Sequence, residues 1–342
     1  MRESGAYGIM LILIAGFLQG TFMLPIKYAR QWEWENTWLG FSISGYVGFP
    51  WLVAFLTVPH LHQVFVNTSN TPLAWTFLWG LGWGLGGLLF GLGVNYVGLA
   101  LGFAIVIGLT AAIGTLIPLL LVSHVDLAST QGTFIVAGVV VTLFGIALCS
   151  WAGKLRENVS AKSRNTSDGP PKRSFGLGVL LCVLSGVLCP CGNLGFAFGS
   201  EMTAMATKWG TAPQYASTLL WALLALPPFI CNGAFCVYLL LRKQTSTRFL
   251  LPGTKRNFLL ATSMGAMWLG GMILYGMGAN VLGAMGSSIG WAIVMSLMVL
   301  VANLWGLLAG EWRGVSRKPL WMMSAGLAVL VAAMFMVGLR IR

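Results

Sequence analysis

Long apolar stretches separated by short polar connections dominate the pattern of hydrophobic and polar positions along this chain. Each stretch holds about 20 or more residues, enough to cross about 30 Å of hydrocarbon as a helix that rises about 1.5 Å per residue. The pattern therefore predicts an all-α integral membrane protein with ten transmembrane helices. We expect these helices at residues 6–28, 37–58, 73–96, 98–122, 131–153, 175–199, 217–241, 257–280, 284–309 and 320–339.

A polar and basic segment at residues 154–174 interrupts this series after the fifth stretch. It contains Asp168-Gly169-Pro170-Pro171, a run that is typical of turns and incompatible with an apolar membrane helix. The segment predicts a first five-helix repeat at 1–153, a cytoplasmic basic linker at 154–174 and a second five-helix repeat at 175–342.

The two sets of five stretches also match each other in sequence. With an offset of 185 residues the third stretch aligns with the eighth, and a weaker match at an offset of 170 relates the first stretch to the sixth. The pairs at the first offset are Gly80 with Gly265, Trp83 with Trp268, Gly86 with Gly271, Leu89 with Leu274, Gly91 with Gly276, Gly93 with Gly278, Asn95 with Asn280 and Gly98 with Gly283.

Each copy has an odd number of spans, so the second copy must enter the membrane upside down. The sequence thus predicts two inverted repeats, an arrangement from which many carriers obtain one state open to each side of the membrane. The offsets also indicate that the second half carries about fifteen extra residues after its first span, near Glu201–Tyr215.

The composition indicates a lipid environment, and the distribution of charge indicates a topology. Of 342 residues, 57% are hydrophobic and 8% are charged, which is more apolar surface than one soluble core of this size covers. The net charge of +12 would suit a nucleic-acid partner, yet most of the 20 Lys and Arg residues follow the odd-numbered stretches. Because positive charge stays in the cytoplasm during insertion, we expect these connections inside, both termini outside and no nucleic-acid partner.

Several short motifs are distributed along the chain from the first connection to the end of the ninth stretch. They are Pro25-Ile26-Lys27, Trp32-Glu33-Trp34-Glu35-Asn36-Thr37-Trp38, Trp83-Gly84-Leu85-Gly86, Phe90-Gly91-Leu92, Gly108-Leu109-Thr110, Gly114-Thr115-Leu116, Trp268, Gly270-Gly271, Trp291 and Glu311-Trp312. Together they resemble the L-rhamnose-proton symporter family over nearly the whole chain. The resemblance implies the drug/metabolite transporter fold, with two inverted five-helix halves, in a bacterial inner-membrane protein that takes up a deoxy-sugar with protons.

A site for a monosaccharide usually combines an aromatic face with amides and hydroxyls that reach the rim of the ring. Residues of these types lie near the middle of the predicted helices or where the repeats meet. A polar side chain buried in lipid also serves as a contact between helices, and both interpretations stay open for each residue. The substrate-binding candidates are Gln19, Thr21, Trp83, Thr110, Asn193, Asn232, Trp268, Ser287, Ser288 and Trp291.

A proton-driven carrier needs a titratable group that each side of the membrane reaches in turn. None of the eight Asp and Glu residues lies in the middle of a predicted span. Glu35 opens the second helix eight residues after Lys27, so Lys27 or Arg30 is a plausible partner, and Glu201 ends the sixth helix on the outer side. We name Glu35, Lys27 and Glu201 as coupling candidates. The alternative is that these carboxylates cap helix ends within an interfacial aromatic belt.

Prolines are predicted to interrupt the first, fourth, sixth and seventh helices, at Pro25, Pro118, Pro190 and the pair Pro227-Pro228. Interruptions free backbone carbonyls, which accept a hydrogen bond from a ligand or coordinate an ion, and the alternative is that these prolines only kink the helices. If sodium drives transport, such carbonyls together with Thr110 or Ser288 are its candidate site.

These features predict a secondary active transporter that takes up a monosaccharide or deoxy-sugar by proton symport through alternating access. The alternative is a carrier or exporter of another small polar metabolite, sodium-coupled or uncoupled, because no carboxylate lies mid-span. We expect no enzyme and no metal site, since the chain has no HExxH motif, paired membrane acids or Ser-His-Asp set. The expected partners are the sugar, the proton or sodium, and the lipid bilayer, with the chain as a monomer or homodimer.

Overall fold

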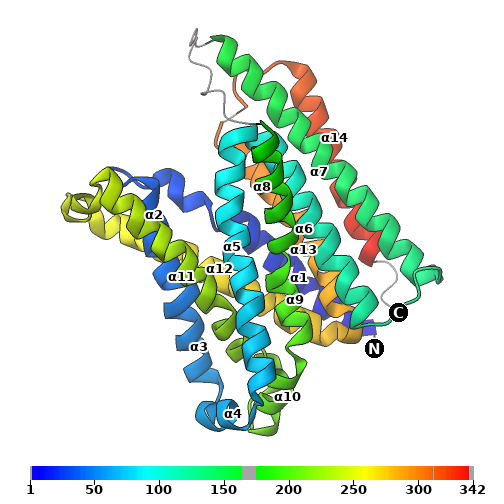
Figure 1. The fold of residues 1–342 in the computed structure, drawn as a ribbon. Helices are drawn as coiled ribbons and strands as arrows, with labels where there is room; N and C mark the ends of the chain where they lie inside the picture. Colours follow the sequence, from blue (N-terminus) through cyan, green and yellow to red (C-terminus); the bar gives the residue numbers. More distant parts are fainter. Residues whose placement is uncertain (1, 164–174, 311, 339–342) are drawn as a thin grey trace.

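The computed structural model describes residues 2–163, 175–310 and 312–338. These residues form helices and connections with no β-strand among them (Figure 1). Nine helical stretches in the described ranges are long and apolar enough to cross a membrane. One of the nine, Thr254–Leu308, has 55 residues and contains two helices joined by a short 3-10 turn. The chain is therefore an all-helical, multi-pass membrane protein.

The first half of the chain begins with the helices that will surround the functional site. Its elements are α1 (Arg2–Thr21), η1 (Leu24–Tyr28), α2 (Trp34–Ser42), the π-helix η2 (Ile43–Gly48), α3 (Phe49–Thr57), α4 (Leu61–Asn67), α5 (Asn70–Val97), α6 (Leu99–Leu121) and α7 (Thr130–Ser163). α7 continues as a helix past residue 153, into the predicted linker, and residues 164–174 of that linker lie outside the described residues.

The second half of the chain is also built of long helices and short helical segments. Its elements are α8 (Phe175–Leu188), α9 (Cys191–Phe198), α10 (Ser200–Lys208), η3 (Pro213–Tyr215), α11 (Thr218–Lys243), η4 (Ser246–Leu250), α12 (Thr254–Leu282), η5 (Gly283–Met285), α13 (Gly286–Leu308) and α14 (Arg317–Gly338). Residue Glu311 of the last quoted motif lies outside the described residues.

Three helices that were predicted as single spans are divided. The span predicted at 6–28 becomes α1 and η1, the span at 37–58 becomes α2, η2 and α3, and the span at 175–199 becomes α8 and α9. Two of these breaks lie beside Pro25 and Pro190, where interruptions were predicted.

The predicted interruptions at Pro118 and at Pro227-Pro228 were wrong. α6 continues through the first proline, and α11 continues through the pair. A proline removes one backbone hydrogen bond, and neighbouring helices in a membrane bundle tolerate that loss without ending the helix. The carbonyl of Pro118 itself accepts hydrogen bonds from the amides of Val122 and Ser123 at the end of α6.

The two halves are interleaved rather than packed as separate domains. α1, from the first half, lies against α12 and α13, whereas α5 lies against α8 and α11 of the second half. α7 and α14 run side by side along one edge of the molecule (Figure 1). Helices of both halves therefore contribute side chains to the interior.

Two of these helix crossings depend on glycines at matching positions. A methyl group added at Gly93 of α5 would lie 2.7 Å from Cys182 Sγ of α8. A methyl group added at Gly278 of α12 would lie 2.7 Å from the Ile12 side chain of α1. The two glycines are related by the offset of 185 and their neighbours by the offset of 170. Small residues at such positions let helix backbones approach closely in lipid.

The crossing of α7 with α14 has the same reciprocal form. A methyl group at Gly145 would meet the Leu330 side chain at 2.9 Å, and one at Gly326 would meet Cys149 Sγ at 2.7 Å. Gly145 therefore faces the residue four positions after Gly326, and Gly326 faces the residue four positions after Gly145.

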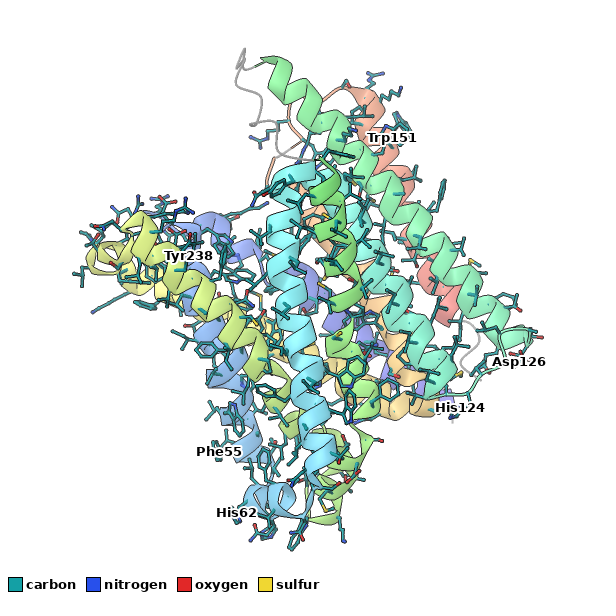
Figure 2. All side chains as sticks on the ribbon, in the orientation of Figure 1. Phe55, His62, His124, Asp126, Trp151 and Tyr238 are labelled. Carbon is teal, nitrogen blue, oxygen red and sulfur yellow. The ribbon has the colours of Figure 1, made fainter. Side chains whose placement is uncertain are left out.

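The outer faces of the helices carry large apolar side chains. Phe55 and Trp151 are 66% and 64% exposed, and both project from the surface of the bundle (Figure 2). A soluble protein rarely exposes so many such groups together, whereas hydrocarbon chains cover them without cost.

Candidate functional site

Two tryptophans, one from each half, stack on each other inside the bundle. The ring centroids of Trp83 on α5 and Trp268 on α12 lie 5.7 Å apart, with 26° between the ring planes. Tyr46 of η2 meets Trp268 edge-on at 4.9 Å, and Phe41 of α2 lies 5.1 Å from Tyr46. These four residues form the aromatic cluster, in which the two tryptophans occupy positions related by the offset of 185.

Close contacts between backbones position the aromatic cluster. Gly45, next to Tyr46, packs against Gly265 of α12, where an added methyl group would lie 2.7 Å from the Gly45 nitrogen. A methyl group at Gly192 would lie 2.7 Å from the Trp83 ring. The irregular turn that carries Tyr46 is a π-helix, a form found mostly as single turns and frequently at functional sites.

A polar cluster begins one residue beyond Gly192. Asn193 on α9 is fully buried, and its Nδ2 donates to the carbonyl oxygen of Gly114 at 2.7 Å and of Ser287 at 3.3 Å. The hydroxyl of Tyr275 donates to Asn193 Oδ1 and lies 3.0 Å from the Ser287 carbonyl oxygen. Asn193 thus joins α6, α12 and α13, and this polar cluster comprises Asn193, Tyr275 and Ser287.

Trp291 of α13 lies between the polar cluster and α6. Its Nε1 donates to the Thr110 carbonyl oxygen at 3.1 Å, and its ring lies 5.9 Å from that of Tyr275. Among the residues that the structure describes, the buried hydroxyls of Thr110, Thr115 and Ser288 have no hydrogen-bond partner. Leaving such a group unpaired costs about 1–3 kcal/mol, so these hydroxyls are candidate contacts for a polar ligand.

Of the two candidates on α1, one reaches the aromatic cluster and one does not. Gln19 Nε2 donates to the Trp268 carbonyl oxygen at 2.8 Å, which fixes the backbone behind that indole. The Thr21 hydroxyl donates to the Phe17 carbonyl oxygen at 2.7 Å and accepts the Trp305 Nε1 proton at 2.9 Å. Thr21 therefore ties α1 to α13, away from the tryptophan stack.

Asn232 reaches the aromatic cluster only through another side chain. Its Oδ1 accepts the Trp38 Nε1 proton at 2.9 Å, and its Nδ2 donates to the Pro228 carbonyl oxygen at 2.8 Å. The Trp38 ring lies 4.8 Å from Phe41. Asn232 thus supports one wall of the cluster from α11.

Glu35 is fully buried where α2 begins, and its partners come from the other half of the chain. Oε2 lies 3.0 Å from Lys243 Nζ at the end of α11, and Oε1 accepts the Thr245 hydroxyl proton at 2.8 Å. A carboxylate in the first turn of a helix is also stabilised by the helix dipole. The spacing along the chain had suggested Lys27 or Arg30 as its cation, but the structure gives it Lys243.

A second ion pair joins the same two parts of the chain. The Glu33 carboxylate lies 2.9 Å from the Arg248 guanidinium, and Trp32 Nε1 donates to the Arg248 carbonyl oxygen at 3.2 Å. We call this contact between residues 30–36 and 243–257 the charged seam. It holds the first half to the second at one end of the molecule.

The other coupling candidates lie apart from this carboxylate. Lys27 is exposed on η1. Glu201, at the start of α10, is exposed and accepts the Ser69 hydroxyl proton at 2.7 Å. The start of α2 and α10 lie toward opposite ends of the bundle in Figure 1, so Glu35 and Glu201 do not share a site.

Sequence reasoning missed Tyr46 and Tyr275, as well as the role of Lys243. Tyr275 follows Trp268 by seven residues, which places both on one face of α12, and that spacing could have identified it. Lys243 was considered only as a topology signal. No sequence signal marks Tyr46, because its orientation depends on the π-helix turn.

Comparison with known proteins finds one family and a set of curated relatives. The chain matches the family described as L-rhamnose-proton symport protein (RhaT) over residues 1–342. The L-rhamnose-proton symporter of Cronobacter sakazakii is 30% identical over 348 residues, with 99% of each chain covered. The L-rhamnose-proton symporters of Escherichia coli (strain 55989 / EAEC) and Shigella dysenteriae serotype 1 are each 29% identical over 348 residues, with the same coverage.

Proposed function

Because the chain belongs to the L-rhamnose-proton symport protein family over its whole length, we propose that it takes up L-rhamnose, or a closely similar monosaccharide, together with protons. The family consists of transporters, so the chain is a carrier and not an enzyme. The observation that carries the proposal is the pair of repeat-related tryptophans, Trp83 and Trp268, stacked between the two halves.

The aromatic cluster and the polar cluster have the chemistry that a neutral sugar requires. A pyranose offers an apolar ring face, which packs on an indole, and a rim of hydroxyls, which need donors and acceptors. We place the ring against Trp83 or Trp268, with the free hydroxyls of Thr110 and Ser288 and the amide of Asn193 at its rim. All of these side chains are uncharged, in keeping with an uncharged cargo.

We propose that the fold consists of ten spans in two inverted halves, with α12 and α13 as separate spans. The crossings at Gly93 and Gly278 support this arrangement, because the glycines and their neighbours obey the two offsets read from the sequence. The reciprocal contact of Gly145 with Gly326 supports it independently. Two states of similar free energy, one open to each side, follow from such a repeat.

Alternating access requires each end of the path between the halves to open in turn. The charged seam closes one end, so it must separate before the sugar can leave there. We propose Glu35 as the coupling group, since a proton on its carboxylate removes the charge that holds Lys243. Lys27, exposed on η1 next to this end, remains the alternative cation when the seam is open.

We place the protein in a bacterial inner membrane with the charged seam toward the cytoplasm and both termini outside. Basic side chains gather where α7 and α11 end and where α14 begins, as Lys154, Arg156, Arg242, Lys243, Arg317 and Lys318. The preference of such residues for the cytoplasmic side supports this orientation.

Uptake by purified protein in liposomes tests the proposal. Labelled L-rhamnose should accumulate when the interior is made alkaline, and an imposed sodium gradient at equal pH should produce no accumulation. Liposomes without protein serve as the control. Exchange of labelled for unlabelled sugar without any gradient reports the carrier alone. Absence of both accumulation and exchange for L-rhamnose and its 6-deoxy isomers would remove the sugar from the proposal.

A further inference from the structure

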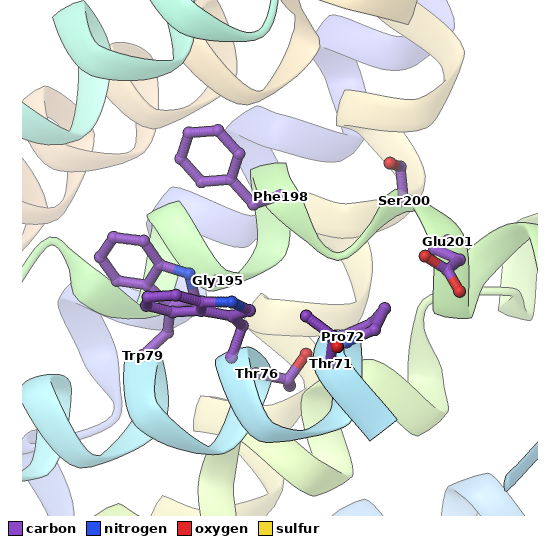
Figure 3. Close-up of a pocket in the computed structure, with 9 residues that line it drawn as sticks. Thr71, Pro72, Thr76, Trp79, Gly195, Phe198, Ser200 and Glu201 are labelled. Carbon is purple, nitrogen blue, oxygen red and sulfur yellow. The ribbon is translucent and has the colours of Figure 1, made fainter. Parts of the chain in front are cut away.

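A pocket separate from the tryptophan stack lies between α5 of the first half and α9–α10 of the second. Its volume is about 430 Å³, within the range of about 300–1,000 Å³ that is usual for small-molecule sites. The wall contains Trp75, Thr76 and Trp79 from α5, Phe198 from α9, and Glu201 from α10 (Figure 3). Neither the substrate candidates nor the charged seam uses this pocket.

Thr76 indicates that the pocket takes a polar ligand. The residue is only 2% exposed, and it belongs to the wall of the pocket. A threonine inside a helix commonly bonds back to a carbonyl one turn earlier, as Thr21 and Thr57 do here. The Thr76 side chain lines the pocket, where its hydroxyl can contact a bound ligand.

The remaining wall combines apolar faces with one carboxylate. Trp79 stacks on Phe198 with 5.9 Å between ring centroids, and Trp75, which is 56% exposed, lies 6.5 Å from Trp79. Glu201 Oε1 accepts the Ser69 hydroxyl proton, and the exposed side chain offers its second oxygen to a further donor. Adjacent hydroxyls on one face of a sugar ring are suitable donors, and the opposite apolar face suits an indole.

The position of the pocket assigns it to one end of the transport path. It lies beside α10, which starts the segment of about fifteen residues that has no counterpart in the first half. α10 packs toward α4, at the end of the bundle opposite the charged seam. At the matching place near the charged seam, η1 packs directly against α12.

We propose that this pocket is a capture site for the transported monosaccharide on the outer face, with Thr76 and Glu201 as its polar contacts. The proposal rests on the proposed function, because the ligand is the cargo of the carrier. Thr76→Val and Glu201→Gln should each raise the sugar concentration for half-maximal uptake about tenfold, with a smaller change in maximal rate. Ser69→Ala, which leaves the Glu201 carboxylate in place, should keep the half-saturating concentration of the unaltered protein.

These three variants distinguish a direct contact of Glu201 with the sugar from an effect through its hydrogen bond with Ser69. If Glu201 acts only through its contact with Ser69, Ser69→Ala and Glu201→Gln will change uptake in the same way, and the capture role is overturned. Equal half-saturating concentrations in all three variants and the unaltered protein would overturn it as well.

Protection from chemical modification provides a direct measure of binding. Thr71, exposed in the pocket wall, is replaced by Cys and treated with a membrane-impermeant maleimide, with modification at residue 71 followed by mass spectrometry. L-rhamnose should slow this modification, whereas it should not slow modification of Asn67→Cys, which is exposed on neighbouring α4 outside the pocket. No protection in a protein that still transports sugar would refute the capture site and leave the proposed function intact. Loss of transport in the unaltered protein would refute the proposed function itself.

Discussion

The aromatic and polar clusters contain no charged side chain, whereas the charged seam holds Glu35 fully buried between Lys243 and Thr245. At the scale of the residue, the proposed recognition of sugar and the proposed response to protons therefore use different groups. Substitutions should separate the two activities.

Replacing either tryptophan of the stack tests recognition. Trp83→Ala and Trp268→Ala should each weaken equilibrium binding of labelled L-rhamnose to the purified protein by about fivefold to tenfold, because an aromatic partner contributes about 0.5–1.5 kcal/mol beyond its buried area. Trp151→Ala, on an exposed outer face, is the matched control and should bind normally. Unchanged affinity in both interior variants would reduce the stack to a packing contact.

Replacing the buried carboxylate tests coupling. Glu35→Gln keeps the shape of the side chain but removes its charge, so accumulation driven by a pH gradient should be lost while exchange of labelled sugar remains measurable. Glu33→Gln, which removes the half-exposed partner of Arg248, should still accumulate sugar. Full accumulation by Glu35→Gln would exclude this residue as the coupling group.

The candidates that the structure brings together most closely are two residues with a copy in the other half of the sequence. Trp83 and Trp268 were named as aromatic faces near the middle of the predicted helices, they also align at one offset, and the structure stacks them together. Thr21 shows the limit of that reasoning, since only the structure reveals that its hydroxyl accepts a hydrogen bond from Trp305 Nε1. Partners more than 200 residues apart, such as Lys243 for Glu35, leave no local signal.

At the scale of the element, glycines decide where helices cross. Gly93→Val and Gly278→Val should each destabilise the protein by about 1–3 kcal/mol, because the added side chain overlaps the neighbouring helix. Gly91→Val is the control on the same helix, since no atom lies within 4 Å of a methyl group placed there. The measurement is thermal unfolding of purified protein in detergent. Equal melting temperatures for all three variants would show that these crossings tolerate wider spacing.

The length of the apolar stretches in the sequence predicted the long helices but not the breaks within them. α2, η2 and α3 occupy one predicted span, because hydropathy is the same for α-, π- and 3-10 turns. Pro190 ends a helix and Pro118 does not, since the outcome depends on which neighbours satisfy the freed carbonyl. Such information lies in the packing rather than in the local sequence.

At the scale of the whole molecule, the proposed mechanism requires the two halves to move relative to each other at the charged seam. A cleavable cross-linker that joins Glu33→Cys to Arg248→Cys should stop sugar uptake, and cleavage of the linker should restore it. The control joins Tyr238→Cys with Arg242→Cys, one turn apart on α11, and should leave uptake intact. Transport that persists through a complete seam cross-link would require a path that does not involve this opening.

The meeting of Trp83 with Trp268 also bears on the size of the cargo. The two indoles stack with 5.7 Å between their ring centroids, so a sugar ring can lie against either one only after they separate. A separation that admits one flat ring lets a monosaccharide lie parallel to an indole, whereas a disaccharide, bent at its glycosidic linkage, needs a wider one. We therefore expect the molecule to reject rhamnose once a second sugar is attached to it.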